Sequence, residues 1–226
     1  MSTTLISSGH SKCMGVSEAV RAPVWKRLED LVLALPALVI LLPVFALIAL
    51  AIRVEDNGPV FFSDERVGAG GRHFRMVKFR TMVPAAISEG LGRLVAADDD
   101  RITSVGALLR RFSMDELPQL LNVIAGNMSL VGPRPTIAQQ VSRYTPRHMG
   151  RLRAKPGLTG LAQVSGRNDL SWNDRIELDL RYIQEMSPVL DLAILFRTPF
   201  VVLGGRGLYG REGVTPDYDS EGGDQS

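Results

Sequence analysis

The feature of this chain that most constrains its fold is an uninterrupted apolar run from Leu31 to Ile52. The run contains no charged or strongly polar residue, and a helix rises about 1.5 Å per residue, so a helix over this run could reach across the hydrocarbon core of a bilayer. Lys26 and Arg27 precede the run and Arg53 follows it. The sequence therefore predicts that this segment inserts into a membrane.

Two prolines inside the run determine how it can insert. Pro36 and Pro43 have no backbone N–H, so each leaves the carbonyl four residues earlier without its helical hydrogen bond. The two prolines lie on nearly the same helix face, and their kinks therefore add. We expect the membrane helix to break at Pro36 and Pro43 and to enter and leave the bilayer on one side, as a re-entrant helix.

The alternatives to re-entry are a straight transmembrane anchor and a cleaved signal peptide. Basic residues on both flanks disfavour a single span, because a spanning helix normally has its excess of Lys and Arg on the cytoplasmic side. The run is also longer than the core of a signal peptide, and the basic pair lies far from Met1. Re-entry is therefore the favoured interpretation.

The remainder of the chain predicts a helix-rich α+β fold with a small β-hairpin or sheet. Val60–Phe62 and His73–Phe79 flank a Gly-rich loop and are predicted to form the hairpin. No alternating βαβ pattern, G-x-G-x-x-G motif or Walker loop is present in the sequence, so a Rossmann fold is not expected. Apolar residues recur at helical spacing in later segments, of which the last could lie in the membrane interface: Ile102–Phe112, Leu117–Ile124, Trp172–Glu185 and Leu190–Leu203.

Composition divides the chain into tails, a membrane helix and a body. Residues 1–22 and 206–226 are rich in Ser, Gly and Asp and are expected to be disordered tails. Residues 23–57 form the re-entrant helix, and residues 58–205 form the body with its interfacial helices. The single cysteine, Cys13, excludes a disulfide within the chain. Aromatic residues make up 6% of the chain and are not interleaved with the basic ones, so no nucleic-acid partner is expected.

Two adjacent carboxylates are the strongest candidates for chemistry. Asp115 and Glu116 follow the basic pair Arg110-Arg111 and lie at the start of a predicted helix. Such a pair is often only a helix cap. An aspartate can also attack a phosphoryl group to form an acyl phosphate, while a neighbouring carboxylate positions Mg²⁺. We therefore assign Asp115 and Glu116 as candidate catalytic residues and as candidate Mg²⁺ ligands.

Basic residues from several parts of the sequence could accompany this pair. Arg134 lies between Pro133 and Pro135, which stiffen its loop, so binding an anion there costs little entropy. Taken singly, each basic residue is of a kind that is usually solvated at a protein surface. Together they predict a site for a strongly anionic ligand such as a sugar diphosphate. The candidate substrate-binding residues are Lys78, Arg80, Arg110, Arg134 and Arg167.

The motifs occur in an order that resembles a known family. The series begins with Lys26-Arg27 and the apolar run, and continues through Lys78-Phe79-Arg80-Thr81-Met82, Asp115-Glu116-Leu117-Pro118-Gln119-Leu120, Gly132-Pro133-Arg134-Pro135, Pro156-Gly157-Leu158-Thr159-Gly160, the segment 162–168 and Leu178-Asp179. It resembles the bacterial sugar transferases called monotopic phosphoglycosyl transferases. The resemblance extends from about Lys26 to about Leu203, and several long motifs in fixed order make it specific.

The resemblance implies a re-entrant membrane helix and a catalytic domain on the cytoplasmic face of the bacterial inner membrane. It implies Mg²⁺ as the cofactor, a UDP-sugar as the donor, and undecaprenyl phosphate as the acceptor of the sugar phosphate, with UMP released. Membrane lipids would surround the helix, and the product would initiate exopolysaccharide, O-antigen, capsule or glycoprotein glycan synthesis. Asp115 would be the nucleophile that forms a covalent phosphosugar intermediate, and Glu116 would serve metal binding or acid–base catalysis.

The basic residues do not all match the family pattern equally well. Lys78, Arg110 and Arg134 match basic positions that contact phosphates in the family, whereas the assignment of Arg167 to the nucleotide is a looser match. The chain also departs from the family pattern, because Leu42 stands where a serine often precedes the proline. Leucine offers no hydroxyl to the carbonyls that the kink frees, so the bend would depend on the prolines alone. A second departure is Asn127, where an aspartate is frequent.

Two alternative interpretations stay open at this point. The lipid phosphate could attack the donor directly in a ternary complex, with Asp115 acting as a base. The chain could instead be a non-catalytic, membrane-anchored scaffold or regulator that binds anionic lipids in the same cationic cleft. The sequence determines neither the sugar that is transferred nor the oligomeric state, for which a homodimer is one option.

Overall fold

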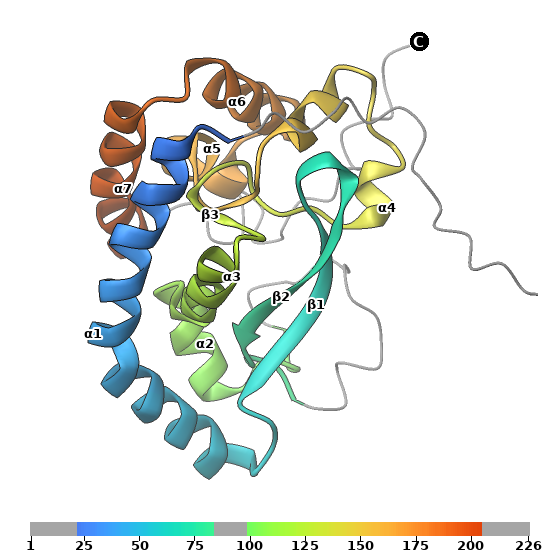
Figure 1. Ribbon diagram of the computed structural model, residues 1–226. Coiled ribbons are helices and arrows are strands. Elements are labelled where there is room, and N and C mark those ends of the chain that lie inside the picture. Colours follow the sequence, from blue (N-terminus) through green and yellow to red (C-terminus); the bar gives the residue numbers. More distant parts are fainter. Residues whose placement is uncertain (1–21, 84–98, 205–226) are drawn as a thin grey trace, which may run out of the picture.

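The computed structural model describes residues 22–83 and 99–204. Apart from Ala22, the expected tails at 1–22 and 206–226 lie outside the described residues. Within the described ranges the fold is helix-rich α+β with small sheets, which confirms the predicted fold class (Figure 1). The elements are α1 (Val24–Asp56), β1 (Phe61–Val67), η1 (Ala69–Gly71), β2 (His73–Phe79), α2 (Ser104–Arg111), η3 (Met114–Gln119), α3 (Leu120–Ala125), β3 (Ser129–Val131), α4 (Ala138–Val141), η4 (His148–Arg153), β4 (Gly157–Thr159), α5 (Leu161–Ser165), η5 (Arg167–Asp169), α6 (Trp172–Glu185) and α7 (Pro188–Leu203).

Helix α1 continues through both of its prolines. Figure 1 shows α1 along one edge of the molecule, beside α7, α3 and α2, and bent around the body. The helix is bent, as kinks at Pro36 and Pro43 predict, but it is continuous, because a proline removes one hydrogen bond while the neighbouring turns keep theirs. A break at these prolines inside a membrane stays a prediction. The helix ends at Asn57, which adopts the left-handed conformation with a φ of 56°. Re-entry into the bilayer stays a prediction.

The apolar part of α1 supports membrane association. By length and composition α1 could cross a membrane, and most of its apolar stretch is exposed instead of being packed in the body. Exposed side chains include Val39, Ile40 and Leu47, each more than 60% accessible. A soluble core helix would bury these side chains, so the apolar surface of α1 matches an element that lies in lipid.

A buried ion pair ties the first turns of α1 to α7. Lys26 Nζ pairs with the carboxylate of Asp191, and neither side chain is more than 5% exposed. The Tyr182 hydroxyl of α6 lies 2.8 Å from Asp191 Oδ1 and 3.1 Å from the carbonyl oxygen of Val131 in β3. Burial raises the pKa of Tyr182, so its hydroxyl stays protonated and can donate. This cluster joins α1, α6, α7 and β3.

Further hydrogen bonds hold the start of α1 to the centre of the body. Asp30 Oδ1 accepts hydrogen bonds from Ser129 Oγ and from Leu130 N, each at 2.8 Å. Arg27 Nη1 donates to the carbonyl oxygen of Val123, at 2.6 Å, near the C-terminus of α3, where helix carbonyls have no helical partner. These contacts determine which face of α1 meets the body.

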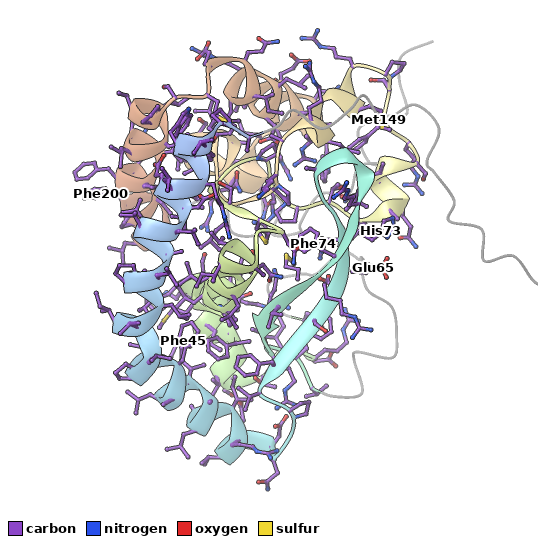
Figure 2. The ribbon with its side chains drawn as sticks, in the orientation of Figure 1. Phe45, Glu65, His73, Phe74, Met149 and Phe200 are labelled. Carbon is purple, nitrogen blue, oxygen red and sulfur yellow. The ribbon has the colours of Figure 1, made fainter. Side chains whose placement is uncertain are left out.

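An aromatic cluster joins the second half of α1 to the hairpin. Strands β1 and β2 pair antiparallel, with Phe61 opposite Phe79 and Val67 opposite His73. The Phe79 ring is stacked on Phe61, with centroids 5.4 Å apart, and meets the edge of Phe45 at 5.2 Å. Figure 2 shows Phe45 pointing from α1 toward the body. The hairpin is thereby fixed against α1 at the end of β2.

The predicted hairpin is confirmed, but its first strand is longer than expected. The sequence prediction ended this strand at Phe62, whereas β1 continues to Val67. The polar residues of its second half concealed the strand pattern. The negative charge of the buried Asp64 is balanced by Arg66, whose Nε donates to Asp64 Oδ2 at 3.0 Å. A short-range ion pair therefore allows a charged residue to occupy an inward-facing strand position.

Local sequence signals determine most of the helix boundaries. Helix α2 begins after Thr103, whose side chain accepts a hydrogen bond from Gly106 N at 3.0 Å. The helix predicted at 117–124 is instead a 3-10 turn, η3, followed by α3, because Pro118 lies within this region and lacks the N–H for a regular helix. Helix α6 has the predicted bounds, and α7 begins at Pro188 after the cap residue Ser187.

A second, parallel sheet was not predicted. Strands β3 and β4 pair at the centre of the body, with Ser129 opposite Gly157 and Val131 opposite Thr159. Gly157 has no room for a side chain, since a Cβ there would lie 2.1 Å from Gly132 N. Strands of three residues are too short to show a period in the sequence, so this pairing depends on the close approach of the two segments.

The outer face of α7 is apolar and exposed. Its exposed large hydrophobic residues recur at helical spacing and are Val189, Leu192, Phe196, Phe200 and Leu203. Figure 2 shows Phe200 pointing away from the body. This face matches the expected interfacial helix, because a membrane-surface helix presents one apolar face to lipid.

The buried pair gives a first prediction. Replacing Lys26 by Met leaves the Asp191 carboxylate buried without its cation, and the expected loss of stability is about 3–5 kcal/mol. Urea unfolding in detergent measures the change. The matched control is Arg181→Met, which removes an exposed pairing with Glu185 and is expected to cost under about 1 kcal/mol. Equal losses for the two variants would contradict the anchoring role of the Lys26–Asp191 pair.

Candidate active site

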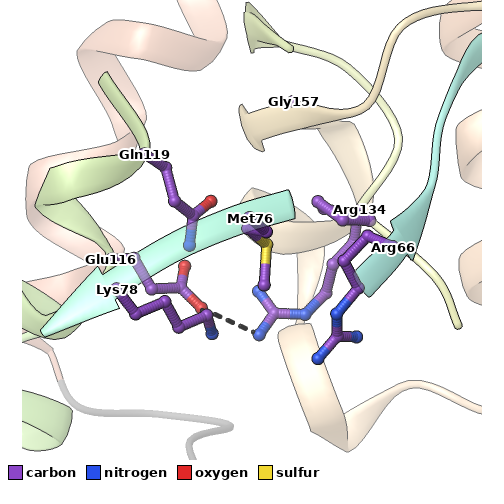
Figure 3. A pocket seen from close by; sticks show the side chains of 8 residues that line it. Arg66, Met76, Lys78, Glu116, Gln119, Arg134 and Gly157 are labelled. Atoms are coloured by element: carbon purple, nitrogen blue, oxygen red, sulfur yellow. Dashed lines mark hydrogen bonds and ion pairs between the residues drawn. The ribbon is translucent and has the colours of Figure 1, made fainter. Parts of the chain in front are cut away.

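The acidic pair lies where α2 turns into η3, next to strand β2. Ser113 adopts the left-handed conformation with a φ of 52°, and this turn places Asp115 and Glu116 in the first turn of η3. Glu116 Oε1 accepts hydrogen bonds from Lys78 Nζ at 3.1 Å and from Arg134 Nη2 at 3.0 Å. Figure 3 shows this carboxylate between the two cations. Three segments far apart in the sequence therefore meet at one carboxylate.

The two carboxylates have opposite electrostatic environments. Burial raises the pKa of Asp115, and the charge of Glu116 raises it further, while Lys78 and Arg110 oppose the change. Burial also acts against ionisation of Glu116, but Arg134 and Lys78 outweigh it and hold the pKa of Glu116 well below its usual range. The neighbouring cations therefore favour the ionised form of Glu116, whereas burial favours the protonated form of Asp115. Such a separation of pKa values is typical of paired carboxyl groups with different roles.

Two further arginines flank the acidic pair. Arg110 Nε donates to Thr81 Oγ1 at 2.8 Å, and its positive charge lowers the pKa of Asp115. Arg167 Nη2 donates to Ser113 Oγ at 2.7 Å, two residues before Asp115. In the part of the chain that the structure describes, Arg167 Nη1 is buried and has no hydrogen-bond partner. A buried, unpaired guanidinium nitrogen beside two carboxylates is suited to an anionic ligand.

Arg80 is the predicted site residue that the structure places elsewhere. Its guanidinium is buried and pairs with Asp56 at the end of α1. It also fills the space beside Gly58, where a Cβ would lie 2.1 Å from Arg80 Nη1. Arg80 thus fixes the junction between α1 and the hairpin, and its contact with a substrate stays a prediction. Lys78, Arg110, Arg134 and Arg167 are brought together around the acidic pair.

A buried arginine that the sequence analysis did not identify holds the Arg134 loop. Arg151 donates to the carbonyl oxygen of Arg134 at 3.0 Å, to the Tyr144 hydroxyl at 2.7 Å and to Asp179 Oδ2 at 2.6 Å. Burial raises the pKa of Asp179 to about 6 although Arg151 opposes this. Asp179 belongs to the Leu178-Asp179 motif, but its partner Arg151 is 28 positions away in the sequence. No local sequence pattern could therefore predict that the two residues pair.

A small pocket opens beside the acidic pair. Its walls come from β1, β2, η3, the loop after β3 and β4, and its lining residues are Arg66, Met76, Lys78, Glu116, Gln119, Arg134, Pro135 and Gly157 (Figure 3). The sequence analysis named Lys78, Glu116 and Arg134 but assigned no role to Gln119 or Arg66. The pocket is lined by the carboxylate of Glu116 and by basic side chains. The basic side chains suit phosphate groups and the carboxylate suits hydroxyl groups, so the pocket fits a ligand that carries both.

The acidic pair is compatible with Mg²⁺ only when a ligand contributes donors. Among the described residues, no group of three or more His, Cys, Asp or Glu side chains could hold a metal ion. Asp115 and Glu116 supply two adjacent carboxylates. Mg²⁺ is usually held by one or two carboxylates together with substrate phosphates and water. The donor set therefore fits a Mg²⁺ ion that binds together with a phosphorylated substrate.

Comparison with known proteins identifies the family. A model of the family described as bacterial sugar transferase matches residues 21–205. The chain belongs to this sugar transferase family. The exopolysaccharide production protein ExoY of Sinorhizobium fredii is 41% identical over 198 residues, which cover 81% of this chain and 88% of that protein. An uncharacterized sugar transferase of Bacillus subtilis, EpsL, is 40% identical over 89% of this chain and 98% of its own length.

Some relatives of this sugar transferase are longer. The undecaprenyl-phosphate galactose phosphotransferase of Salmonella typhimurium is 41% identical over 199 residues, which cover 81% of this chain but 41% of that protein. The chain thus spans about two fifths of such relatives. The matched region contains the acidic pair and all the basic residues around it, so the family predicted from the motifs is confirmed.

The opposite environments of the two carboxylates give a second prediction. Replacing Glu116 by Gln removes a negative charge that raises the pKa of Asp115, so this pKa is expected to fall. Titration of ¹³C-carboxyl-labelled aspartate by NMR measures the change, with the signal assigned by its loss in Asp115→Asn. Glu185→Gln, on the exposed end of α6, is the control and should leave the midpoint unchanged. A midpoint that stays constant or rises in Glu116→Gln would contradict the electrostatic coupling.

Proposed function

We propose that this sugar transferase moves a sugar-1-phosphate from a UDP-sugar to undecaprenyl phosphate and releases UMP. The observation that carries this proposal is the placement of the carboxyl group of Asp115 beside Glu116, which is itself held by Lys78 and Arg134. The Salmonella typhimurium relative is named an undecaprenyl-phosphate galactose phosphotransferase, which supports both the carrier and the reaction type.

In the first step, an ionised Asp115 oxygen attacks the β-phosphorus of the donor. A bond forms between that oxygen and phosphorus, and the bond from phosphorus to the bridging diphosphate oxygen breaks. UMP leaves with the electron pair, and the sugar phosphate stays on Asp115 as an acyl phosphate. Lys78, Arg110 and Arg134 are positioned to offset the negative charge of the diphosphate as it redistributes.

In the second step, a phosphate oxygen of undecaprenyl phosphate attacks the same phosphorus. The bond between phosphorus and Asp115 breaks, the carboxylate is regenerated, and the product is a lipid diphosphate sugar. Arg167, whose Nη1 has no partner in the described structure, is assigned to the nucleotide or to the incoming phosphate. Because each step exchanges one phosphoanhydride bond for another, the reaction needs no oxidant or reductant.

Mg²⁺ is proposed as the cofactor, held by Asp115 and Glu116 together with oxygens of the donor diphosphate. When bound, it would neutralise diphosphate charge and so assist departure of UMP. Glu116 is suited to this role because its pKa is low and it stays ionised. The half-buried position of Asp115 limits the access of water to the acyl phosphate.

The membrane elements complete the proposal. We assign α1 to a re-entrant arrangement in the bacterial inner membrane, with the body on the cytoplasmic face and the apolar face of α7 in the interface. This arrangement holds the site beside the membrane surface, where the phosphate of a polyprenyl carrier lies. Initiation of exopolysaccharide or a related glycan is the proposed biological role, supported by the name of the Sinorhizobium fredii relative.

UMP release is the direct test of the reaction. Purified protein in detergent, with Mg²⁺, undecaprenyl phosphate and a panel of UDP-sugars, is expected to release UMP with at least one donor. Asp115→Asn should lower the rate by at least about 10³-fold, because the amide cannot serve as the nucleophile. Asp174→Asn, an exposed residue of α6, is the matched control and should retain activity. A folded wild-type protein that releases UMP from no donor would favour the non-catalytic scaffold.

Isotope exchange separates the covalent route from direct attack in a ternary complex. With a covalent intermediate, labelled UMP is expected to enter the UDP-sugar pool in the absence of undecaprenyl phosphate, since the first step is reversible on its own. Asp115→Asn should abolish this exchange. If UMP is released only with lipid phosphate present and no exchange occurs without it, the ternary mechanism with Asp115 as a base is correct.

A further inference from the structure

Gln119 combines two properties that the proposed mechanism has not used. It is 2% exposed, and its Nε2 is buried without a hydrogen-bond partner among the residues that the structure describes. Its side chain also lines the pocket beside the acidic pair, together with Lys78, Glu116 and Arg134 (Figure 3). A buried amide donor facing a polar pocket is the expected state of a ligand-binding group before its ligand is present.

The local fold explains why Gln119 faces this pocket. It is three residues after Glu116 in the 3-10 helix η3, where side chains three apart lie on one face. Pro118 lies in the same turn, which restricts the backbone before the side chain. The amide is therefore presented by a rigid turn, and little conformational entropy would be lost when it binds.

Gln163 shows that an unpaired amide alone does not define such a site. Both polar atoms of its side chain are also buried without partners in the described structure. Gln163 lies on α5, however, and is not among the residues that line the pocket. Gln119 differs from Gln163 because it combines an unpaired donor with a position in the cationic pocket.

We propose that Gln119 donates a hydrogen bond from Nε2 to a non-bridging oxygen of the phosphoryl group that is transferred. The inference rests on the proposed function and deepens it by adding a neutral donor to the cations around the β-phosphate. A phosphate oxygen is favoured over a sugar hydroxyl because Lys78 and Arg134 line the same pocket, and their charge draws the phosphoryl group there. A neutral donor completes its coordination without another buried charge.

Nucleotide binding tests this assignment without turnover. Affinities for UDP and UMP are measured by calorimetry at constant Mg²⁺ for wild type, Gln119→Met and the control Gln163→Met. UDP contains the β-phosphate and UMP does not. Gln119→Met is expected to weaken UDP binding by about 10-fold or more, as for loss of a hydrogen bond to a charged group, and to leave UMP binding unchanged. Gln163→Met should change neither affinity.

The outcomes distinguish this inference from the proposed function. Unchanged UDP affinity in Gln119→Met, with UMP binding showing that the site is folded, would overturn the role of Gln119 and leave the proposed function standing. Wild-type protein that binds neither nucleotide would overturn the proposed function together with this inference. If Gln119→Met does not fold, Gln119→Asn, which withdraws the amide by one methylene, should weaken UDP binding selectively.

Discussion

The buried ion pair between Lys26 and Asp191 is the contact on which the arrangement of this protein depends. An apolar helix has no preferred orientation toward a polar body unless specific groups hold it, because lipid accepts any of its apolar faces. Lys26, Asp30 and Tyr182 supply those groups, and they join α1 to α6, α7 and β3. The same contacts place the apolar outer surfaces of α1 and α7 beside each other (Figure 1). The body is consequently held at a defined position relative to the apolar surface of α1.

The site uses a second ion-pair system for a different purpose. Glu116 joins β2, η3 and the loop after β3 through Lys78 and Arg134, and Arg151 holds the backbone of that loop from behind. The negative charge of Glu116 adds to the effect of burial on Asp115, so the pKa of Asp115 is raised while that of Glu116 is lowered. Lys78 and Arg134 stabilise the ionised form of Glu116, and their remaining N–H groups are of the kind that binds phosphate oxygens.

Much of the site could be predicted from short motifs, whereas its supporting contacts could not. Asp115, Glu116 and Arg134 lie in motifs whose residue types already indicate phosphate chemistry, and the structure brings them together. Arg80 lies in an equally suggestive motif but pairs with Asp56, because a basic residue binds whichever carboxylate the fold brings near. Gln119 was part of a predicted motif without a role, since an amide shows its purpose only when burial and missing partners are known.

The sequence by itself determined the long apolar helix, the hairpin strand His73–Phe79, the bounds of α6 and the identity of the acidic pair. These features depend on local properties: apolar length, residue periodicity, capping and side-chain chemistry. Only the tertiary structure decided which face of α1 meets the body, the parallel pairing of β3 with β4, and which arginines lie around the acidic pair. Each of these depends on contacts between residues far apart in the chain, whose strength comes from burial and geometry that a linear sequence does not contain.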